Sequence, residues 1–181
     1  MSFAASAIGD VARSSRPGYA RGVDHWPEPV ERVAAVLRQQ AVDARLEEFP
    51  AGTSTAAAAA DAVGCEAAEI VKSIVFVCDG LPVLALVPGD RRADPSKVAA
   101  AAEAKAGRVA IPEEVLAVTG FEPGAVAPFP APHVSRTLIE RELLRHETVW
   151  VGAGSTRHMA GLSPLDLARL TRAEVGDLTE G

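Results

Sequence analysis

The chain of 181 residues carries 18 lysines and arginines against 24 aspartates and glutamates, a formal net charge of −6. Its length favours a single domain, and a hydrophobic fraction of 48% with only eight aromatic residues predicts a core of small aliphatic side chains. The excess of acidic groups excludes a protein that grips nucleic acid along an extended basic surface, so any such contact must be local. No apolar run approaches the ~20 residues that a membrane-spanning helix needs.

The two cysteines, Cys65 and Cys78, lack the paired spacing of zinc ligands and are too few for a disulfide framework. We therefore expect reduced thiols in a cytoplasmic protein. The four histidines show no metal-ligand spacing, so neither a metal nor another cofactor is expected. Residues 1–27 are predicted to form a flexible tail, and residues 28–181 a single domain.

Three elements are predicted in the first part of the chain. Apolar residues at helical spacing indicate a helix that begins near Glu28. A short strand is expected over Arg45–Phe49. A helix over Ala56–Val63 follows, because Thr53–Thr55 offer hydroxyls for its N-terminal cap and Gly64 suits a left-handed C-terminal cap.

The clearest local signal is a β-hairpin. The runs Ser73–Cys78 and Leu81–Val87 are rich in Val, Ile and Leu and are separated by Asp79-Gly80. Asp-Gly between two such runs indicates a type I′ turn, in which both turn residues have positive φ. The near-continuous apolar character predicts strands that are covered on both faces, so the hairpin is expected at the centre of a sheet.

Two helices, Pro95–Ala106 and Pro112–Thr119, are predicted next, each opened by a proline and closed by a glycine. The short strand Arg108–Ile111 is expected between them. Residues 121–132 contain one glycine and four prolines, which are too many for regular structure throughout.

The last part of the chain is predicted as a helix over Leu138–Arg145, strands over Thr148–Val151 and His158–Gly161, and a final helix that begins at Ser163 and reaches Leu170. Strands and helices do not alternate regularly along the sequence. The pattern therefore favours the α+β class over a doubly wound parallel sheet.

Lys72 is the first candidate functional residue. It is one of only three lysines and lies at the entry to the most apolar strand. One interpretation is a surface lysine whose ammonium reaches water from a strand end. The other is a fixed cation in a cleft, placed to hold a carbonyl, a phosphate or a carboxylate.

Two loops are further candidates. Gly120–Phe129 combines glycine and proline, so it could form a rigid oxyanion pocket or could serve to pack Phe121 and Phe129 into the core. The loop Gly152–His158 is a weak phosphate-binding signal, because it lacks the helix and the lysine of a P-loop.

These motifs together resemble the YbaK/ProX family, the aminoacyl-tRNA deacylase domain that also occurs as an editing insertion in bacterial prolyl-tRNA synthetases. The resemblance covers about Thr53 to Leu170. It rests on four segments in the family's order: Ile70–Ser73 with its lysine, Gly124–Pro128 as a G-x-x-x-P loop, Val149–Ser155, and Leu162–Leu167.

The resemblance implies a mixed, largely antiparallel curved sheet of about six or seven strands surrounded by helices. It implies trans-editing, the hydrolysis of the ester that joins a mischarged small amino acid to the tRNA 3′ end, above all on tRNA-Pro. Water, or a hydroxyl or thiol of the substrate, would be the nucleophile. The partners implied are the aminoacyl-tRNA 3′ end and a synthetase that delivers it, with no membrane and no extended nucleic-acid surface.

By the same resemblance, Lys72 positions the terminal adenosine or the ester. The other implied substrate-binding residues are its neighbour in the strand, four residues of the G-x-x-x-P loop and three that line the opposite wall: Ser73, Gly124, Ala125, Val126, Pro128, Gly154, Ser155 and His158.

The sequence departs from the family pattern in one place. Ser135–Glu140 contains no aspartate where many relatives have an acidic residue, so Glu140 takes that role or the role is absent. This departure keeps open an alternative function, a non-catalytic module that binds a nucleotide or an aminoacyl-adenosine. A scaffold that binds a synthetase is a third hypothesis.

Overall fold

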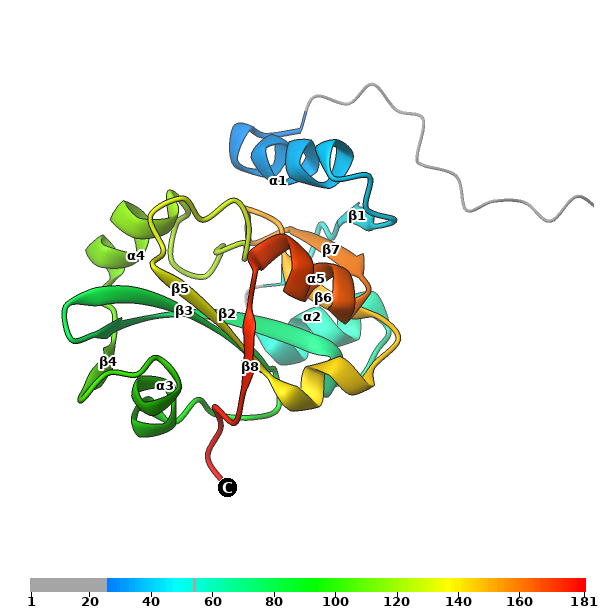
Figure 1. The fold of residues 1–181 in the computed structure, drawn as a ribbon. Helices are drawn as coiled ribbons and strands as arrows, with labels where there is room; N and C mark the ends of the chain where they lie inside the picture. Colours follow the sequence, from blue (N-terminus) through cyan, green and yellow to red (C-terminus); the bar gives the residue numbers. More distant parts are fainter. Residues whose placement is uncertain (1–25, 54) are drawn as a thin grey trace, which may run out of the picture.

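The computed structural model describes residues 26–53 and 55–181, which form an eight-stranded mixed sheet with helices on both faces (Figure 1). The tail predicted over residues 1–27 lies outside the described residues except for its last two. The helices are α1 (Glu28–Gln39), α2 (Ala56–Val63), α3 (Pro95–Ala101), α4 (Pro112–Thr119) and α5 (Pro164–Thr171), with 3₁₀ helices η1 (Ala67–Glu69) and η2 (Arg141–Arg145). The strands are β1 (Arg45–Glu48), β2 (Ile70–Cys78), β3 (Leu81–Pro88), β4 (Gly107–Val109), β5 (Arg136–Glu140), β6 (Val149–Gly152), β7 (His158–Leu162) and β8 (Glu174–Gly176).

The β2–β3 hairpin lies at the centre of the sheet, as predicted. The strand order is β1-β7-β6-β2-β3-β5-β8, with β4 paired to β2 beside this path. Asp79 and Gly80 have φ values of 47° and 84°, so the turn has the two positive φ angles of type I′. Local turn chemistry thus sets the register that places Lys72 opposite Val87.

The predicted fold class is confirmed. The pairs β1–β7, β6–β7, β2–β3 and β2–β4 are antiparallel, whereas β2–β6, β3–β5 and β5–β8 are parallel. The sheet has eight strands where six or seven were expected. No sequence signal marked β8, because its three residues pair with β5 only after α5 has returned the chain to the sheet.

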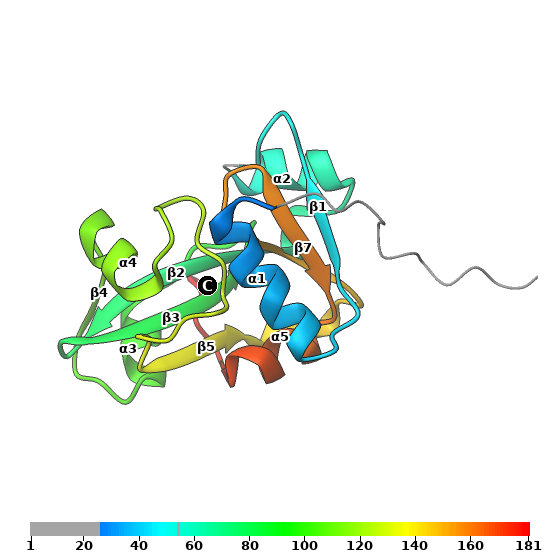
Figure 2. The ribbon, with the colours of Figure 1, turned by 90° about the horizontal axis from the view of Figure 1, so that it is seen from above.

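Both faces of the hairpin are covered, which confirms that prediction. On one face, side chains such as Val75 and Leu84 pack with Val33 and Leu37 of α1 and with α5. Figure 2 shows α1 lying across this face between β3 and β7. On the other face, Phe76 and its neighbours pack against α3, which lies at the bottom of Figure 1.

The predicted helix over Leu138–Arg145 is wrong in its first half. Residues 136–140 form strand β5, which lies between β3 and β8, and only Arg141–Arg145 turn helically. Four successive side chains, from Thr137 to Glu140, are buried. The apolar pair Leu138-Ile139 is too short for periodicity to distinguish a strand from a helix, so tertiary pairing decided between them.

Helix α3 ends at Ala101, five residues earlier than predicted. The backbone N–H groups of Lys105 and Ala106 donate to the Asp79 carboxylate at 2.9 and 3.2 Å, and the Asp79 N–H donates to the Ala106 carbonyl. These bonds tie the segment to the hairpin turn. The hairpin thereby competes successfully with the continuation of the helix.

Helix α2 has the predicted caps. The Thr55 hydroxyl accepts a hydrogen bond of 3.1 Å from the Ala58 N–H, and Gly64 is left-handed at the other end. Within the described residues, no helix has both the length and the apolar character needed to cross a membrane.

Candidate functional site

A gap along one edge of β2 creates the candidate site. On this edge β6 pairs with Ile70 and Val71, and β4 pairs with residues 76–78, so the described chain gives residues 72–74 no strand partner there. A cavity of about 230 Å³ lies at this gap. It is lined by Thr53, Thr55, Ala56 and Ala59 at the start of α2, residues 70–74 of β2, Gly124 and Val126 of one loop, and Gly152, Ser155 and Met159 around another.

Among the described residues that line the cavity, Lys72 is the charged one, and none is acidic. Its half-buried ammonium donates a hydrogen bond to the carbonyl oxygen of Arg91. Burial lowers the pKa of Lys72; the Asp90 carboxylate opposes that shift, and Arg92 adds to it. Because an ammonium has three N–H donors and one binds Arg91, two remain to orient a ligand.

Ser73 adds a buried hydroxyl. Its Oγ atom is shielded from solvent and has no hydrogen-bond partner among the described residues. A buried polar atom without a partner costs free energy, so such an atom beside a cavity favours a ligand that bonds to it. Lys72 and Ser73 together give the cavity a cation and an unused hydroxyl on adjacent residues.

The loop Gly120–Phe129 has the packing role that was one of the two left open by the sequence, and it also borders the cavity. Gly124 and Val126 line the cavity, whereas Phe121 and Phe129 are buried in the main core. The aromatic side chains therefore anchor the two ends of a loop whose middle faces the site. Ala125 is buried away from the cavity.

The opposite wall contains a hydrogen-bonded Ser155–His158 pair. Ser155 Oγ lies 2.6 Å from Nδ1 of His158 and accepts a bond of 3.1 Å from the Arg157 N–H. The hydroxyl hydrogen can then point to Nδ1, which leaves the proton of a neutral imidazole on Nε2. Burial lowers the pKa of His158, while Glu48 acts in the opposite direction and Arg157 reinforces the shift.

The cavity thus brings together five of the nine predicted site residues: Lys72, Ser73, Gly124, Val126 and Ser155. The other four do not line it: Ala125, Pro128, Gly154 and His158. His158 reaches it through Ser155, and Gly154 supports the same wall from behind.

Sequence reasoning missed the α2 wall. Thr53 donates to the Thr156 carbonyl through both its N–H (2.6 Å) and its hydroxyl (3.1 Å), which joins the start of α2 to the Ser155 loop. Ala56 and Ala59 line the cavity with methyl groups. The signal was present in the Thr-rich start of an alanine-rich helix, which was interpreted as a cap and as part of the family resemblance but not as a wall of the site.

Glu140 does not replace the missing aspartate in the cavity. Its carboxylate is buried and accepts a hydrogen bond of 2.6 Å from the Leu178 N–H, which fastens the C-terminal segment to β5. The structure therefore does not support the expectation that Glu140 takes the acidic role of the missing aspartate. Within residues 26–53 and 55–181, no cluster of His, Cys, Asp or Glu is arranged to hold a metal ion.

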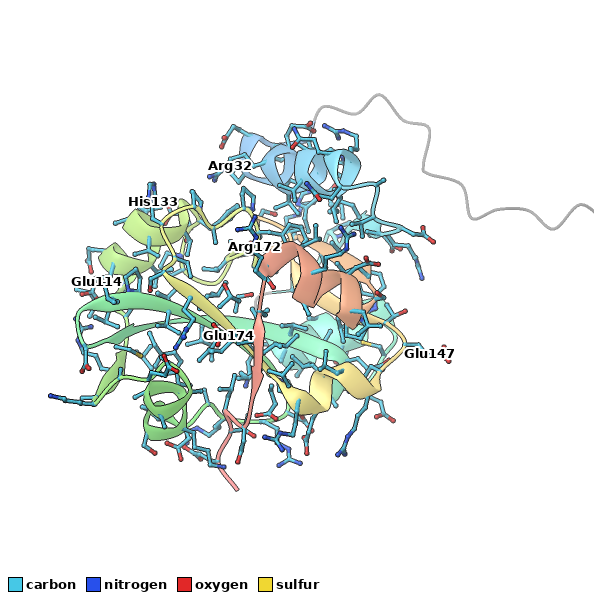
Figure 3. The ribbon with its side chains drawn as sticks, viewed as in Figure 1. Arg32, Glu114, His133, Glu147, Arg172 and Glu174 are labelled. Carbon is cyan, nitrogen blue, oxygen red and sulfur yellow. The ribbon has the colours of Figure 1, made fainter. Side chains whose placement is uncertain are left out.

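A larger cavity of about 450 Å³ lies behind the G-x-x-x-P loop. Pro128 is the sole predicted site residue that lines it, and Arg136 there is paired with Glu103 and Glu174. Arg172 and Glu174, labelled in Figure 3, mark this side of the molecule next to α5 and β8. The smaller cavity is the better candidate because it gathers Lys72, Ser73 and both loops.

Comparisons with known proteins identify the family of the chain. The sequence model of the aminoacyl-tRNA editing domain matches residues 50–170. The uncharacterized protein YwhH of Bacillus subtilis is 33% identical over 131 residues, 72% of this chain and 83% of YwhH. The proline–tRNA ligase of Nitratidesulfovibrio vulgaris is 33% identical over 127 residues, 70% of this chain but only 22% of the ligase.

Solved structures give the same answer. A candidate trans-editing enzyme for prolyl tRNA synthetase superposes with a TM-score of 0.80 at 36% identity, covering 87% of this chain and 100% of that one. The chain belongs to the aminoacyl-tRNA editing domain family, which confirms the YbaK/ProX resemblance. The matched region begins near Pro50, so α1 and β1 precede it.

Proposed function

We propose that the protein is a trans-editing hydrolase that cleaves the ester between a small amino acid and the 3′ end of a mischarged tRNA, with tRNA-Pro as the first candidate. The observation that carries this proposal is the placement of Lys72 and Ser73 at the sheet gap, facing Val126 across a cavity of about 230 Å³. Sites for drug-sized ligands run from ~300 Å³ upward, so this space suits a small aminoacyl group.

The proposed chemistry needs positioning more than a protein nucleophile. Two free N–H donors of Lys72 would orient the terminal ribose or the ester carbonyl, and the Ser73 hydroxyl, which alternation along the strand puts on the other face of β2, would bond to a different part of the substrate. A water oxygen attacks the carbonyl carbon, the bond to the ribose oxygen breaks, and that oxygen leaves with a proton. An ester is already activated, so orientation and stabilisation of the developing oxyanion contribute most of the acceleration.

Size selection follows from the two loops. Val126 and the Gly152 backbone lie against each other at the cavity, which Ala56 and Ala59 also line. A longer amino-acid side chain would overlap these groups. We therefore attribute the rejection of tRNA that carries its correct, larger amino acid to steric exclusion of that amino acid from the cavity.

The net charge of −6 supports recognition of the 3′ end alone. Affinity for the length of a tRNA comes mainly from basic side chains that neutralise its phosphates, and an acidic protein has too few of these side chains. A synthetase that hands over the mischarged tRNA is accordingly the partner we propose. Because the proposed substrate is an aminoacyl-tRNA, we also propose that the protein acts in the cytoplasm.

The test is a panel of mischarged tRNAs incubated with wild type, Lys72→Ala and Lys105→Ala. We expect hydrolysis of at least one small aminoacyl-tRNA by wild type, loss with Lys72→Ala, and full retention with the exposed control Lys105→Ala. Wild-type protein that leaves the whole panel intact would overturn the proposal.

A second candidate function has one observation in its favour. No carboxylate and no imidazole lines the cavity, so the described lining lacks the commonest general bases. This composition fits a non-catalytic module that binds an aminoacyl-adenosine. Thermal stabilisation by a non-hydrolysable aminoacyl-adenosine analogue, without hydrolysis of any panel member, would favour the binding module over the hydrolase.

A further inference from the structure

Trp26 contacts the buried imidazole behind the candidate site. Its ring meets the His158 ring edge-on, with centroids 5.4 Å apart and an interplanar angle of 90°. This tryptophan precedes α1 and lies outside residues 50–170, the part that matches the editing domain. The contact therefore joins a segment that precedes the family model to the wall of the cavity.

The same segment touches this wall at a second point. Gly154 has a φ of +92°, and a Cβ at this position would lie 2.5 Å from the Pro29 carbonyl oxygen and 3.1 Å from the Val30 nitrogen. The start of α1 is thus packed directly on the backbone of the Ser155 loop. Two separate contacts, one through a ring and one through the backbone, fix the same wall.

The contact is transmitted to the cavity through hydrogen bonds. The His158 carbonyl accepts a bond of 3.0 Å from the Ala153 N–H, and Nδ1 lies 2.6 Å from Ser155 Oγ. Because Ser155 also accepts from the Arg157 N–H, one lone pair of its oxygen remains for a ligand. With His158 neutral, Ser155 therefore offers an acceptor to the cavity.

We propose that Trp26 is a positioning residue: it holds His158 against Ser155, so that Ser155 presents an acceptor to a cationic or hydroxyl donor of the substrate, such as an α-ammonium group or a ribose hydroxyl. This inference rests on the proposed function for the identity of the substrate. A protonated His158 would donate from Nδ1 to Ser155 and use the lone pair that the ligand needs.

The charged groups that act on His158 are Glu48, on β1, and Arg157, next to the histidine in sequence. These two are paired with each other at 2.9 Å, so they form a fixed neighbouring ion pair. Trp26 contributes shielding from water on the remaining side. Removing its ring should therefore ease protonation of His158 while leaving the ion pair in place.

The experiment compares Trp26→Ala, Trp26→Phe and Val33→Ala in the full chain. Val33 is a buried α1 residue, so Val33→Ala weakens the packing of α1 without removing the ring on His158. NMR titration follows the His158 imidazole, assigned with His158→Gln, and the pH profile of kcat/KM is measured on the aminoacyl-tRNA that wild type hydrolyses.

We expect Trp26→Ala to raise the His158 pKa and to move the acidic limb of the kcat/KM profile to higher pH. At neutral pH kcat/KM should fall roughly 2- to 10-fold, the size of one aromatic pair contact. Trp26→Phe should restore both values. Val33→Ala should lower the melting temperature and leave the His158 titration unchanged.

An unchanged His158 titration in folded Trp26→Ala would overturn the proposal, as would an equal change in Val33→Ala. If wild type hydrolyses no aminoacyl-tRNA, the proposed function fails separately. The NMR titration still decides whether Trp26 holds His158, and binding of an aminoacyl-adenosine analogue at neutral and acidic pH replaces kcat/KM. Binding that is equally tight at both pH values would then overturn the role assigned to Ser155.

Discussion

The backbone of Gly152 lies directly against the carbonyl oxygen of Val126, where a Cβ would be only 3.0 Å from that oxygen. Both residues line the candidate cavity, although they lie 26 positions apart in the sequence. Their contact closes the cavity between the loop Gly152–His158 and the G-x-x-x-P loop. The width of the site therefore depends on how closely these two backbones approach.

Gly152→Ala should push the two loops apart. The Val126 carbonyl must move by a few tenths of an ångström, and overpacking of this kind costs about 1–3 kcal/mol. We expect a lower free energy of unfolding in urea and weaker discrimination against larger aminoacyl groups. Unchanged stability together with unchanged discrimination would show that the contact does not set the width of the cavity.

Gly154→Ala should cost more than Gly80→Ala. Both glycines have positive φ, at +92° and +84°, so an alanine is strained by a similar amount of about 1–2 kcal/mol at each. Gly80 has open space around it, whereas a Cβ at Gly154 would meet Pro29 backbone at 2.5 Å. The difference between the losses of unfolding free energy in the two variants measures the contact between Gly154 and α1. Equal losses would contradict the importance of that contact.

Glu140→Leu should destabilise the protein by about 1–3 kcal/mol, because the buried Leu178 N–H loses its acceptor. Glu140→Gln keeps a carbonyl oxygen in that place and should lose less. Urea unfolding measures both variants. Deacylation by the folded Glu140→Gln protein should match wild type, because Glu140 does not line the cavity; a specific loss of activity would assign the residue the acidic role expected from relatives.

His158 should make the protein less stable in mild acid. Burial lowers the pKa of His158 in the folded state below its ordinary value of 6.5, so the unfolded chain binds the proton more readily. The stabilisation is complete above that value and is lost as the pH falls through the folded pKa. Between about pH 7.5 and about pH 5.5, unfolding free energy should therefore fall less in His158→Gln than in wild type.

The exposed His133, labelled in Figure 3, supplies the matched control for this comparison. His133→Gln should retain the wild-type dependence of stability on pH. The same reduced slope in both variants would mean that the effect does not come from burial of His158.

Local features could be predicted from the sequence because neighbouring residues determine them. Asp79-Gly80 fixed the hairpin turn through two positive φ angles, and Thr55 and Gly64 marked both ends of α2. Lys72 and Ser73 were found because they belong to a family motif whose residues are contiguous. Together with three residues from two other motifs, they make five of the nine predicted site residues that line one cavity.

Long-range packing decided what the sequence left ambiguous. Residues 136–140 became a strand because β3 and β8 pair with them on both sides, although the local sequence is also compatible with a helix. The gap beside Lys72 exists because β6 and β4 pair with opposite ends of β2 and leave its middle free. Neither pairing has a local signal.

The sequence by itself therefore determined the family, the central hairpin and the lysine that the site is built around. The tertiary structure alone decided that Trp26 lies on His158, that Glu140 supports the C-terminal segment, and that Pro128 faces the second cavity. The physical reason is that turns and caps are short-range interactions, whereas the walls of a cavity are made by segments that meet only when the whole core packs.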